Sequence, residues 1–595
     1  MSPIRIKINK PEYGLLYRAS LLFMLLLGIF SIVLSKERLY GDSADYLLRM
    51  IQESSFFIIH SRPASIFIEW LPVLLIKQGA SLQLVVIAQS FSEWLWMFLN
   101  FIFLGFILKS PKHAIALVMV YLFSIRWNYF NPVSELLLAF PLFILLHYLW
   151  STLHNRVLLT NLLLSWTIGL FLFFSHPLYI IALPVMLGFI WLQESKRRDY
   201  IFIGIGLLAL VALRYYYLDS YEKDPLSTMN LSLTPEKMLK RFIAIGTFYE
   251  LGKCYAGFIF LFIAGAFALK KTKSWLRFSL LIAFVLGFAG LVAHKFGGLY
   301  PETFEPFERY VFILPLTVVT VLIPVWSKWT GWKRNLLILF MSWHAFYMYR
   351  YSRIVVNRYE VFENAIQNSR QFDDAKVVYR KENYHPEFLS NRINGHDWIM
   401  TSESLILSSM KGKDSTKQVY IKELFPDDFY EKLSEDDFMY YISGWTMPVS
   451  SLNHDYMNMK PGKWRVANTD SAQHIDQEFI ESIVFSPSEE AQFSVNEKTH
   501  LQIKLVNQTG QPLFSGMRIR KAGIGYKWLK KGETQLQKGK FLSPLMADLY
   551  SEVNQRIIVV GPETEGEYEL IPGWHFEDND EFYPFGEKMN VSVRN

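Results

Sequence analysis

The main pattern along this chain is a series of long apolar segments that ends near residue 350 of 595. Membrane-spanning helices need about 20 mainly apolar residues, and this series is typical of them. We therefore expect a polytopic α-helical membrane domain with about eleven transmembrane helices. The predicted spans are 15–34, 82–108, 114–128, 135–151, 157–175, 178–193, 200–217, 255–269, 276–293, 310–326 and 335–349.

One apolar segment, 64–76, does not fit this series. It has only about 13 residues, begins after Pro63 and contains Glu69, so we expect an interfacial helix on the outer membrane surface. If it spanned, every later loop would change sides. Without it, the basic residues fall in alternate loops, which the positive-inside rule assigns to the cytoplasm. These loops contain Lys109 and Lys112, Arg156, Lys196 to Arg198, Lys270 to Lys273, and Lys328 to Arg334. The N-terminus is then cytoplasmic and the C-terminal part lies outside.

After residue 350 the pattern becomes that of folded soluble domains. Residues 351–480 mix helix-like stretches (VFENAIQNSRQF, SESLILSSMKG) with strand-like ones such as KQVYIKEL, which predicts an extracytoplasmic mixed α/β region. From about 481, apolar and polar residues alternate between Gly, Pro and Asn, which predicts a small antiparallel β-sandwich. The expected domains are thus 1–350, 351–480 and 481–595.

Composition agrees with a membrane half and a soluble half, because 51% of residues are hydrophobic and 19% are charged. The net charge of +6 is distributed over short clusters, so we do not expect nucleic-acid binding. The single cysteine, Cys254, excludes an internal disulfide and a cysteine-based metal site.

Candidate chemistry begins in the loop GDSADY, 41–46, just after the first predicted span. A helix here would place Asp42, Asp45 and Tyr46 on one face. A carboxylate at the membrane surface can deprotonate an acceptor hydroxyl, so Asp42 and Asp45 are candidate catalytic residues. The alternative is that Asp42 only caps the following helix.

Other outer loops carry candidate binding residues. Arg309, in FERYVFILPL, could bind a lipid phosphate bidentately or could anchor the chain at the interface. Lys240 and Arg241 could face a donor phosphate or form a solvated helix face. Glu135, in NPVSE, could bind an acceptor or complement a helix dipole.

The order of motifs in the first 130 residues resembles that of the GT-C superfamily, notably aminoarabinose transferases and protein O-mannosyltransferases. Asp42 and Tyr46 match the family's Asp-Glu-x-x-Tyr loop, His60 and Pro63 its His-Pro element, and 66–77 its juxtamembrane helix, which ends in KQGAS at Lys77. Ser43 replaces the second acid, and two residues separate His60 from Pro63. Arg309 matches an Arg-Tyr entry into a late helix, and GYKWL at 525–529 resembles a strand of an immunoglobulin-like domain attached to some bacterial glycosyltransferases.

The resemblance implies an inverting glycosyltransferase at the periplasmic face of the bacterial inner membrane. It would transfer a sugar from a polyprenyl-phosphate donor to a lipid, glycan or protein acceptor. Asp42 would be the base and Tyr46 would shape the pocket, while His60 or Arg62, with Arg309 and Lys77, would bind the donor phosphate. A base and cations suffice for a phosphate leaving group, so no metal or other cofactor is expected.

Two other functions remain open. A non-catalytic scaffold of the cell envelope, whose C-terminal domains bind partner proteins, gains support from Ser43. A transporter should show paired broken helices or an inverted repeat, and the sequence shows neither.

Overall fold

The computed structural model divides the chain into two compact units, which we describe separately. The helical unit comprises Met1–Val378, Tyr384–Tyr420 and Leu433–Arg465, and the strand unit comprises Tyr379–Asn383, Ile421–Lys432 and Val466–Asn595. The residues that the structure describes are 11–58, 62–152, 158–193, 197–217, 245–271, 274–296, 311–380, 400–422, 438–440, 446–462, 464–466, 483–487, 493–507, 513–514, 522–538, 546–547, 552–576, 582–584 and 588–594.

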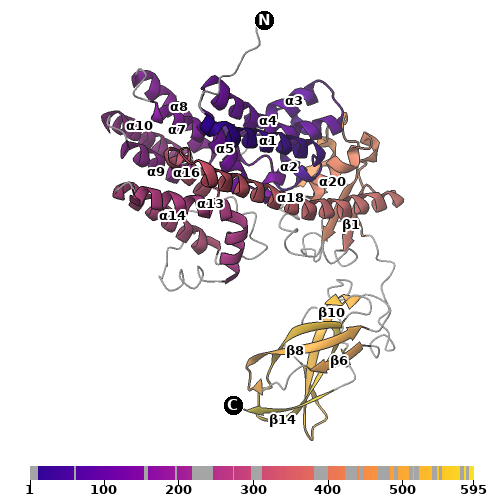
Figure 1. Cartoon of the computed structure of the whole chain (residues 1–595). Helices are drawn as coiled ribbons and strands as arrows, with labels where there is room; N and C mark the ends of the chain where they lie inside the picture. Colours follow the sequence, from indigo (N-terminus) through magenta and orange to yellow (C-terminus); the bar gives the residue numbers. More distant parts are fainter. Residues whose placement is uncertain are drawn as a thin grey trace. The chain divides into compact units, whose positions relative to one another are not determined.

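A helix occupies each of the eleven predicted spans (Figure 1). The helices are α1 (Pro11–Val33), α4 (Leu82–Ile102), α5 (Pro111–Ser124), α6 (Glu135–Leu138), α7 (Phe140–Ser151), α8 (Leu158–Ser175), α9 (Tyr179–Trp191), α10 (Arg197–Tyr216), α13 (Ile245–Lys271), α14 (Trp275–Phe296), α16 (Ile313–Val321), α17 (Ile323–Trp326) and α18 (Gly331–Asn368). A π-helical turn, η3 (Phe103–Ile107), extends α4.

Among the described residues, three helices are long and apolar enough to cross a bilayer: Gly14–Val33, Leu82–Ile107 and Asp199–Tyr216. Other apolar helices, among them Pro111–Ser124, Leu159–Ser175 and Tyr179–Trp191, are shorter, and two further apolar segments are interrupted. The segment 135–151 divides into α6 and α7 at Ala139, and 313–326 divides into α16 and α17 at Leu322. In both places a proline follows within the next two residues and removes a helical hydrogen bond. The crossing of eleven helices therefore stays a prediction.

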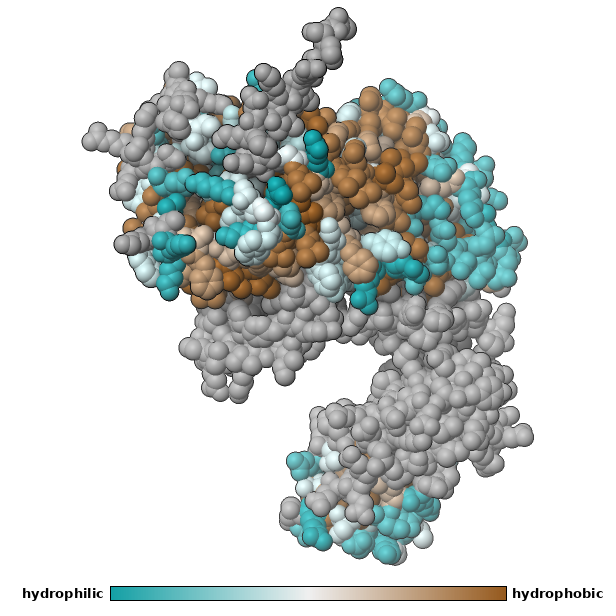
Figure 2. Space-filling model, in the orientation of Figure 1, coloured by the Kyte–Doolittle hydropathy of each residue, from teal (hydrophilic) through white to brown (hydrophobic). Residues whose placement is uncertain are grey.

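Apolar side chains gather on the visible face of the helical unit (Figure 2). Leu22 and Ile29 of α1, Leu208 of α10 and Leu286 of α14 are each 57% to 69% exposed. A water-facing surface rarely exposes so many large apolar side chains, whereas lipid-facing helices do.

Between α1 and α4 the chain forms two short α-helices, each preceded by a 3-10 turn. After η1 (Glu37–Leu39), Gly41 adopts a positive φ of 70° and α2 (Asp42–Glu53) begins. Gly41 is the N-cap residue and Asp42 lies in the first turn, so Asp42 does not cap the helix by its side chain. Then η2 (Pro63–Ser65) leads into α3 (Ile66–Lys77). Its 12 residues span about 18 Å, too short to cross a hydrocarbon core of about 30 Å.

The predicted domain boundary at residue 350 falls inside α18, a single helix of 38 residues. At about 1.5 Å per residue it is roughly 57 Å long, well beyond the thickness of a bilayer core. Its C-terminal part carries Arg358 and Tyr359, which contact α20 (Met400–Ser409). Further elements are η7 (Ser369–Gln371), η10 (Lys413–Ser415), η11 (Val449–Ser451), a β3 (Phe438–Tyr440) and β4 (Thr446–Pro448) hairpin, and a sheet of order β2-β1-β5 from β1 (Lys376–Arg380), β2 (Gln418–Lys422) and β5 (Trp464–Val466).

The strand unit contains two larger sheets, in the part of the chain where the alternating pattern predicted strands. One has the order β13-β8-β6, and the other β11-β10-β14-β16-β7 with β15 beside β14; β9 and β12 form a separate pair. The strands are β6 (Ile483–Pro487), β7 (Phe493–Ser494), β8 (Lys498–Asn507), β9 (Leu513–Phe514), β10 (Ala522–Lys530), β11 (Leu536–Lys538), β12 (Met546–Ala547), β13 (Glu552–Val560), β14 (Gly566–Phe576), β15 (Phe582–Pro584) and β16 (Met589–Arg594).

The pairing differs from the prediction at one place, because β7 and β16 run parallel. Trp528 of β10 is buried and donates to the Val560 carbonyl of β13 at 2.9 Å, which links the two sheets. A buried tryptophan between sheets is typical of a β-sandwich, but the sandwich and its immunoglobulin-like form both remain predictions.

Candidate functional site

Glu135 joins three separate segments that the sequence analysis singled out. Its Oε1 accepts a hydrogen bond from the Tyr46 hydroxyl of α2 at 3.0 Å. Its Oε2 pairs with the Arg62 guanidinium, just before η2, at 3.4 Å. Glu135 itself begins α6, so residues 46, 62 and 135 meet although 89 positions separate the outer two. The structure thus brings together Tyr46, Arg62 and Glu135, three of the predicted binding residues.

Asp42 lies in the first turn of α2, one turn before Tyr46, and is partly exposed; its charge contributes to the raised pKa of Tyr46. Asn131 donates from Nδ2 to Asp42 Oδ2 at 3.5 Å, and its own Oδ1 is buried without a hydrogen-bond partner. Gly41 allows this approach, because a Cβ there would come within 2.9 Å of the Asn131 side chain. Asp42 is thus a carboxylate that is oriented by an amide and still reachable.

Tyr46 is held as a neutral hydrogen-bond donor. Burial, together with the nearby Glu135 and Asp42 carboxylates, raises the Tyr46 pKa well above its usual range. Its ring packs edge-on against Phe57 at 5.3 Å and belongs to an apolar cluster with Ala64, Ile68, Val133 and Leu138. This cluster fixes α2, α3 and α6 against one another.

Asp45 makes a different contact from Asp42. Its carboxylate pairs with Arg49 one turn further along α2, at 3.7 Å. Burial raises the Asp45 pKa to about 6, which Arg49 partly opposes. Because Asp45 already has a cation as its partner, its geometry suits a structural role in α2 better than proton abstraction.

Glu69 is the residue of this cluster that the sequence analysis missed as a site residue. It is fully buried in α3, and its Oε2 accepts the Phe57 backbone N–H at 2.8 Å. Burial and, to a smaller extent, the charge of Glu135 raise the Glu69 pKa to about 7. The signal in the sequence is an acid inside a short apolar segment, a feature that also argues against a membrane span.

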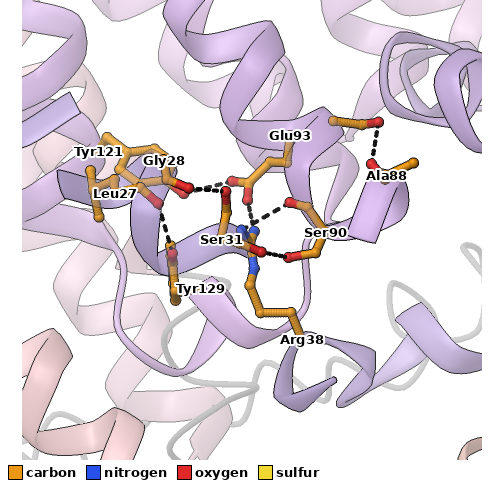
Figure 3. A network of polar contacts seen from close by, with 10 residues as sticks. Leu27, Gly28, Ser31, Arg38, Ala88, Ser90, Glu93, Tyr121 and Tyr129 are labelled. Carbon is orange, nitrogen blue, oxygen red and sulfur yellow. Dashed lines mark hydrogen bonds and ion pairs between the residues drawn. The ribbon is translucent and has the colours of Figure 1, made fainter. Parts of the chain in front are cut away.

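A buried polar network supports the loop that carries Asp42 (Figure 3). Arg38 of η1 pairs with Glu93 of α4, donates to the Ser90 carbonyl at 3.0 Å, and stacks over the Tyr129 ring at 4.3 Å. Tyr121 of α5 also donates to Glu93, at 2.9 Å. Tyr129 belongs to η4 (Trp127–Phe130), immediately before Asn131. The network therefore anchors the two segments that bring Asp42 and Asn131 together.

Residues of the helical unit that follow position 350 also contact α2, α3 and Tyr40. Asn453 donates to the Ile51 carbonyl of α2 at 2.8 Å, and the Tyr456 hydroxyl donates to the Ile76 carbonyl of α3 at 3.2 Å. Arg358 of α18 pairs with Glu403 at 2.6 Å and lies 5.2 Å from the Tyr40 ring, next to Gly41. Both helices of the site loop are thus tied to residues after position 350.

Several predicted site residues do not join the cluster or cannot be placed. Lys77 is exposed in the last turn of α3, about 12 Å along the helix axis from Glu69. It has no contact with the cluster among the described residues. His60, Lys240, Arg241 and Arg309 lie outside the described residues, so their roles stay predictions. In the described ranges no group of three or more His, Cys, Asp or Glu is arranged to bind a metal ion.

Comparison with known proteins adds no family assignment: no protein-family model matches the chain, and no curated protein matches it significantly. The site's chemistry must be argued from its residues. They provide a reachable carboxylate, an arginine, two buried acids and a tyrosine hydroxyl. Such a set can bind hydroxyl groups and an anion and can accept a proton.

Proposed function

We propose that this chain is a membrane glycosyltransferase that transfers a sugar from a polyprenyl-phosphate donor to an acceptor hydroxyl at the outer face of a bacterial inner membrane, with inversion. The observation that supports it most is that Tyr46 and Arg62 both contact Glu135, while Asp42 lies one turn before Tyr46 on α2, near enough for its charge to raise the Tyr46 pKa. They come from loop segments next to long apolar helices, where a lipid-borne substrate and a water-soluble group meet.

In the proposed reaction the Asp42 carboxylate removes the proton of the acceptor hydroxyl. The acceptor oxygen then bonds to the anomeric carbon, on the face opposite the phosphate. The bond between this carbon and the phosphate oxygen breaks, and the lipid phosphate leaves with the electron pair. The phosphate needs no proton, because a nearby cation can stabilise its growing charge.

Arg62 is the described cation best placed for this role. It lies beside Glu135 just before η2, and its side chain is 13% exposed. Its guanidinium can bind a phosphate oxygen pair while one N–H remains on Glu135. Arg309 and His60 remain proposed partners for the same phosphate.

A transfer assay with the full-length protein in proteoliposomes tests this function. The donors are undecaprenyl phosphate carrying a radiolabelled hexose, hexosamine or pentose, and the acceptor is a lipid and glycan extract of a bacterial envelope. We expect labelled product from at least one donor and its loss on Arg62→Ala. The absence of turnover with every donor would instead support the scaffold.

A further inference from the structure

One end of the helical unit carries basic side chains that the proposed reaction does not use. It contains the short connection from α13 to α14 and the short connection from α17 to α18. The Gly257 N–H of α13 donates to His344 of α18 at 3.1 Å, and one turn later in α13 Phe260 stacks on a ring one turn earlier in α18, that of Phe340. The two helices are therefore antiparallel. The end of α13 and the start of α18 consequently lie at the same end of the unit.

This end carries four exposed lysines and two exposed tryptophans, which we call the basic end. Its residues are Lys270, Lys271, Trp275, Lys328, Trp332 and Lys333. The chain has no Asp or Glu in 251–301 or in 309–359, so both connections lack acidic neighbours along the sequence. In the described part of the chain, none of the four lysines pairs with a carboxylate. Their charge is therefore available to an anionic partner.

The two tryptophans indicate where the basic end lies. Trp275 is 55% exposed and Trp332 is 68% exposed. The Lys270 ammonium lies 5.9 Å from the centre of the Trp275 ring, and the Lys333 ammonium lies 5.8 Å from that of Trp332. Exposed tryptophans beside lysines are typical of the boundary between the hydrocarbon core and water, where lipid phosphates lie.

The neighbouring surface restricts the kind of partner. Exposed side chains close to the basic end along each helix are apolar: Phe267 on α13, Leu276 on α14 and Leu339 on α18. A ligand that contacts both surfaces needs an anionic head and apolar chains. A phospholipid with a net negative charge has both, whereas a nucleic acid or an acidic peptide has only the charge.

We propose that the basic end is a binding surface for anionic phospholipids. The lysines contact the lipid phosphate, and the acyl chains lie along the apolar faces of α13, α14 and α18. Zwitterionic lipids bind less well, because the positive group of their head repels the lysines. In the predicted topology this end faces the cytoplasmic leaflet, which is rich in anionic lipid. Lipid binding here does not depend on sugar transfer.

Native mass spectrometry of the full-length protein, released from nanodiscs of equal phosphatidylglycerol and phosphatidylcholine, tests this surface. We expect phosphatidylglycerol to be enriched about 25-fold among the bound lipids, since each of two lysines on a phosphate contributes about fivefold in affinity. Lys270→Gln/Lys333→Gln, which removes one lysine from each connection, should reduce the enrichment to about twofold or less. Lys411→Gln/Lys413→Gln is the matched control, because these two lysines are exposed but lie after position 350. It should keep the wild-type enrichment.

Equal binding of the two lipids to the wild type would overturn the proposal, as would wild-type enrichment in Lys270→Gln/Lys333→Gln. The variant Lys270→Arg/Lys333→Arg keeps the charge and should keep the enrichment, so its loss there would also contradict the proposal. Displacement of phosphatidylglycerol by a soluble polyglutamate peptide would assign the surface to an acidic protein segment instead. Enrichment without sugar transfer would leave this surface intact and refute only the proposed function.

Discussion

At the scale of single residues, the site combines groups whose protonation is set by burial. Glu69 shows this most clearly, because its pKa is raised from 4.5 to about 7 in the folded protein. The folded state then binds a proton more tightly than the unfolded state does between these two values. The contribution of Glu69 to stability is therefore most favourable below about pH 4.5, falls as the pH rises toward 7 and is constant above it.

This shift predicts a measurable pH dependence. Across the window Glu69 should cost the fold about 3 kcal/mol, from roughly 1.4 kcal/mol per pKa unit. We expect the Tm of the purified protein to fall between pH 5 and pH 7.5, and Glu69→Gln to flatten this slope. Glu53→Gln, at the exposed end of α2, is the control that should leave the slope unchanged. Equal slopes in all three proteins would contradict the burial-raised pKa.

Gly41 predicts a second effect at residue scale. Its φ of 70° disfavours any side chain, and an added Cβ would come within 2.9 Å of Asn131. Gly41→Ala should therefore displace Asn131 and Asp42, lowering the Tm and reducing turnover about tenfold or more. Gly79→Ala is a matched control, because Gly79 has a φ of 68° with nothing within 4 Å of the new Cβ. Gly79→Ala should lower the free energy of unfolding only by the backbone strain, about 1 kcal/mol. Identical losses in the two variants would show that the contact with Asn131 does not matter.

At the scale of elements, the buried ion pair between η1 and α4 should be the main support of the site loop. Arg38→Met leaves Glu93 buried without its cation, which typically costs about 3–5 kcal/mol. We expect a large loss of Tm, partly restored in the double variant Arg38→Met/Glu93→Met. Lys36→Met removes a nearby exposed pair with Glu363, in which both side chains are about 45% exposed, and should cost at most about 1 kcal/mol. Thermal unfolding of the four proteins measures this, and a loss in Arg38→Met no larger than in Lys36→Met would refute the support role.

The elements also show what the sequence could predict. Apolar length located the helices, the short proline-preceded segment identified α3, and period-two alternation located β8, β10, β13, β14 and β16. Local spacing predicted α2, with Asp42 and Tyr46 on the site side. These features depend on residues close together in the chain, so they can be predicted from a single sequence.

Long-range partners were beyond the sequence. Asp45 has the same helical spacing as Tyr46, yet it pairs with Arg49. Nothing local indicates that Arg38 pairs with Glu93, or that Asn131 approaches Gly41. Lys77 matched a motif by position, but the length of α3 carries it away from the cluster. Such pairings arise from tertiary packing, which spacing along the chain does not encode.

At the scale of the whole molecule, the proposed function requires a specific membrane topology. The N-terminus should be cytoplasmic, α3 should lie on the outer surface, and residues after α18 should be outside. Membrane-impermeant labelling of single cysteines, in a Cys254→Ser background, can test this. A cysteine at Gly79 should react from the outer side and one at Lys112 only after the membrane is opened. Labelling of Gly79 from the cytoplasmic side alone would contradict a non-spanning α3.

The central claim is that Asp42 removes the acceptor's proton during sugar transfer. The most direct measurement is single-turnover transfer from undecaprenyl-phosphate sugar by wild type, Asp42→Asn and Asp45→Asn in proteoliposomes. We expect Asp42→Asn to bind donor normally but to react about 10²-fold or more slowly, since a general base contributes about 10²–10⁴-fold. Asp45→Asn, whose carboxylate pairs with Arg49, should change the rate only mildly. Small and equal effects in the two variants would contradict a catalytic Asp42.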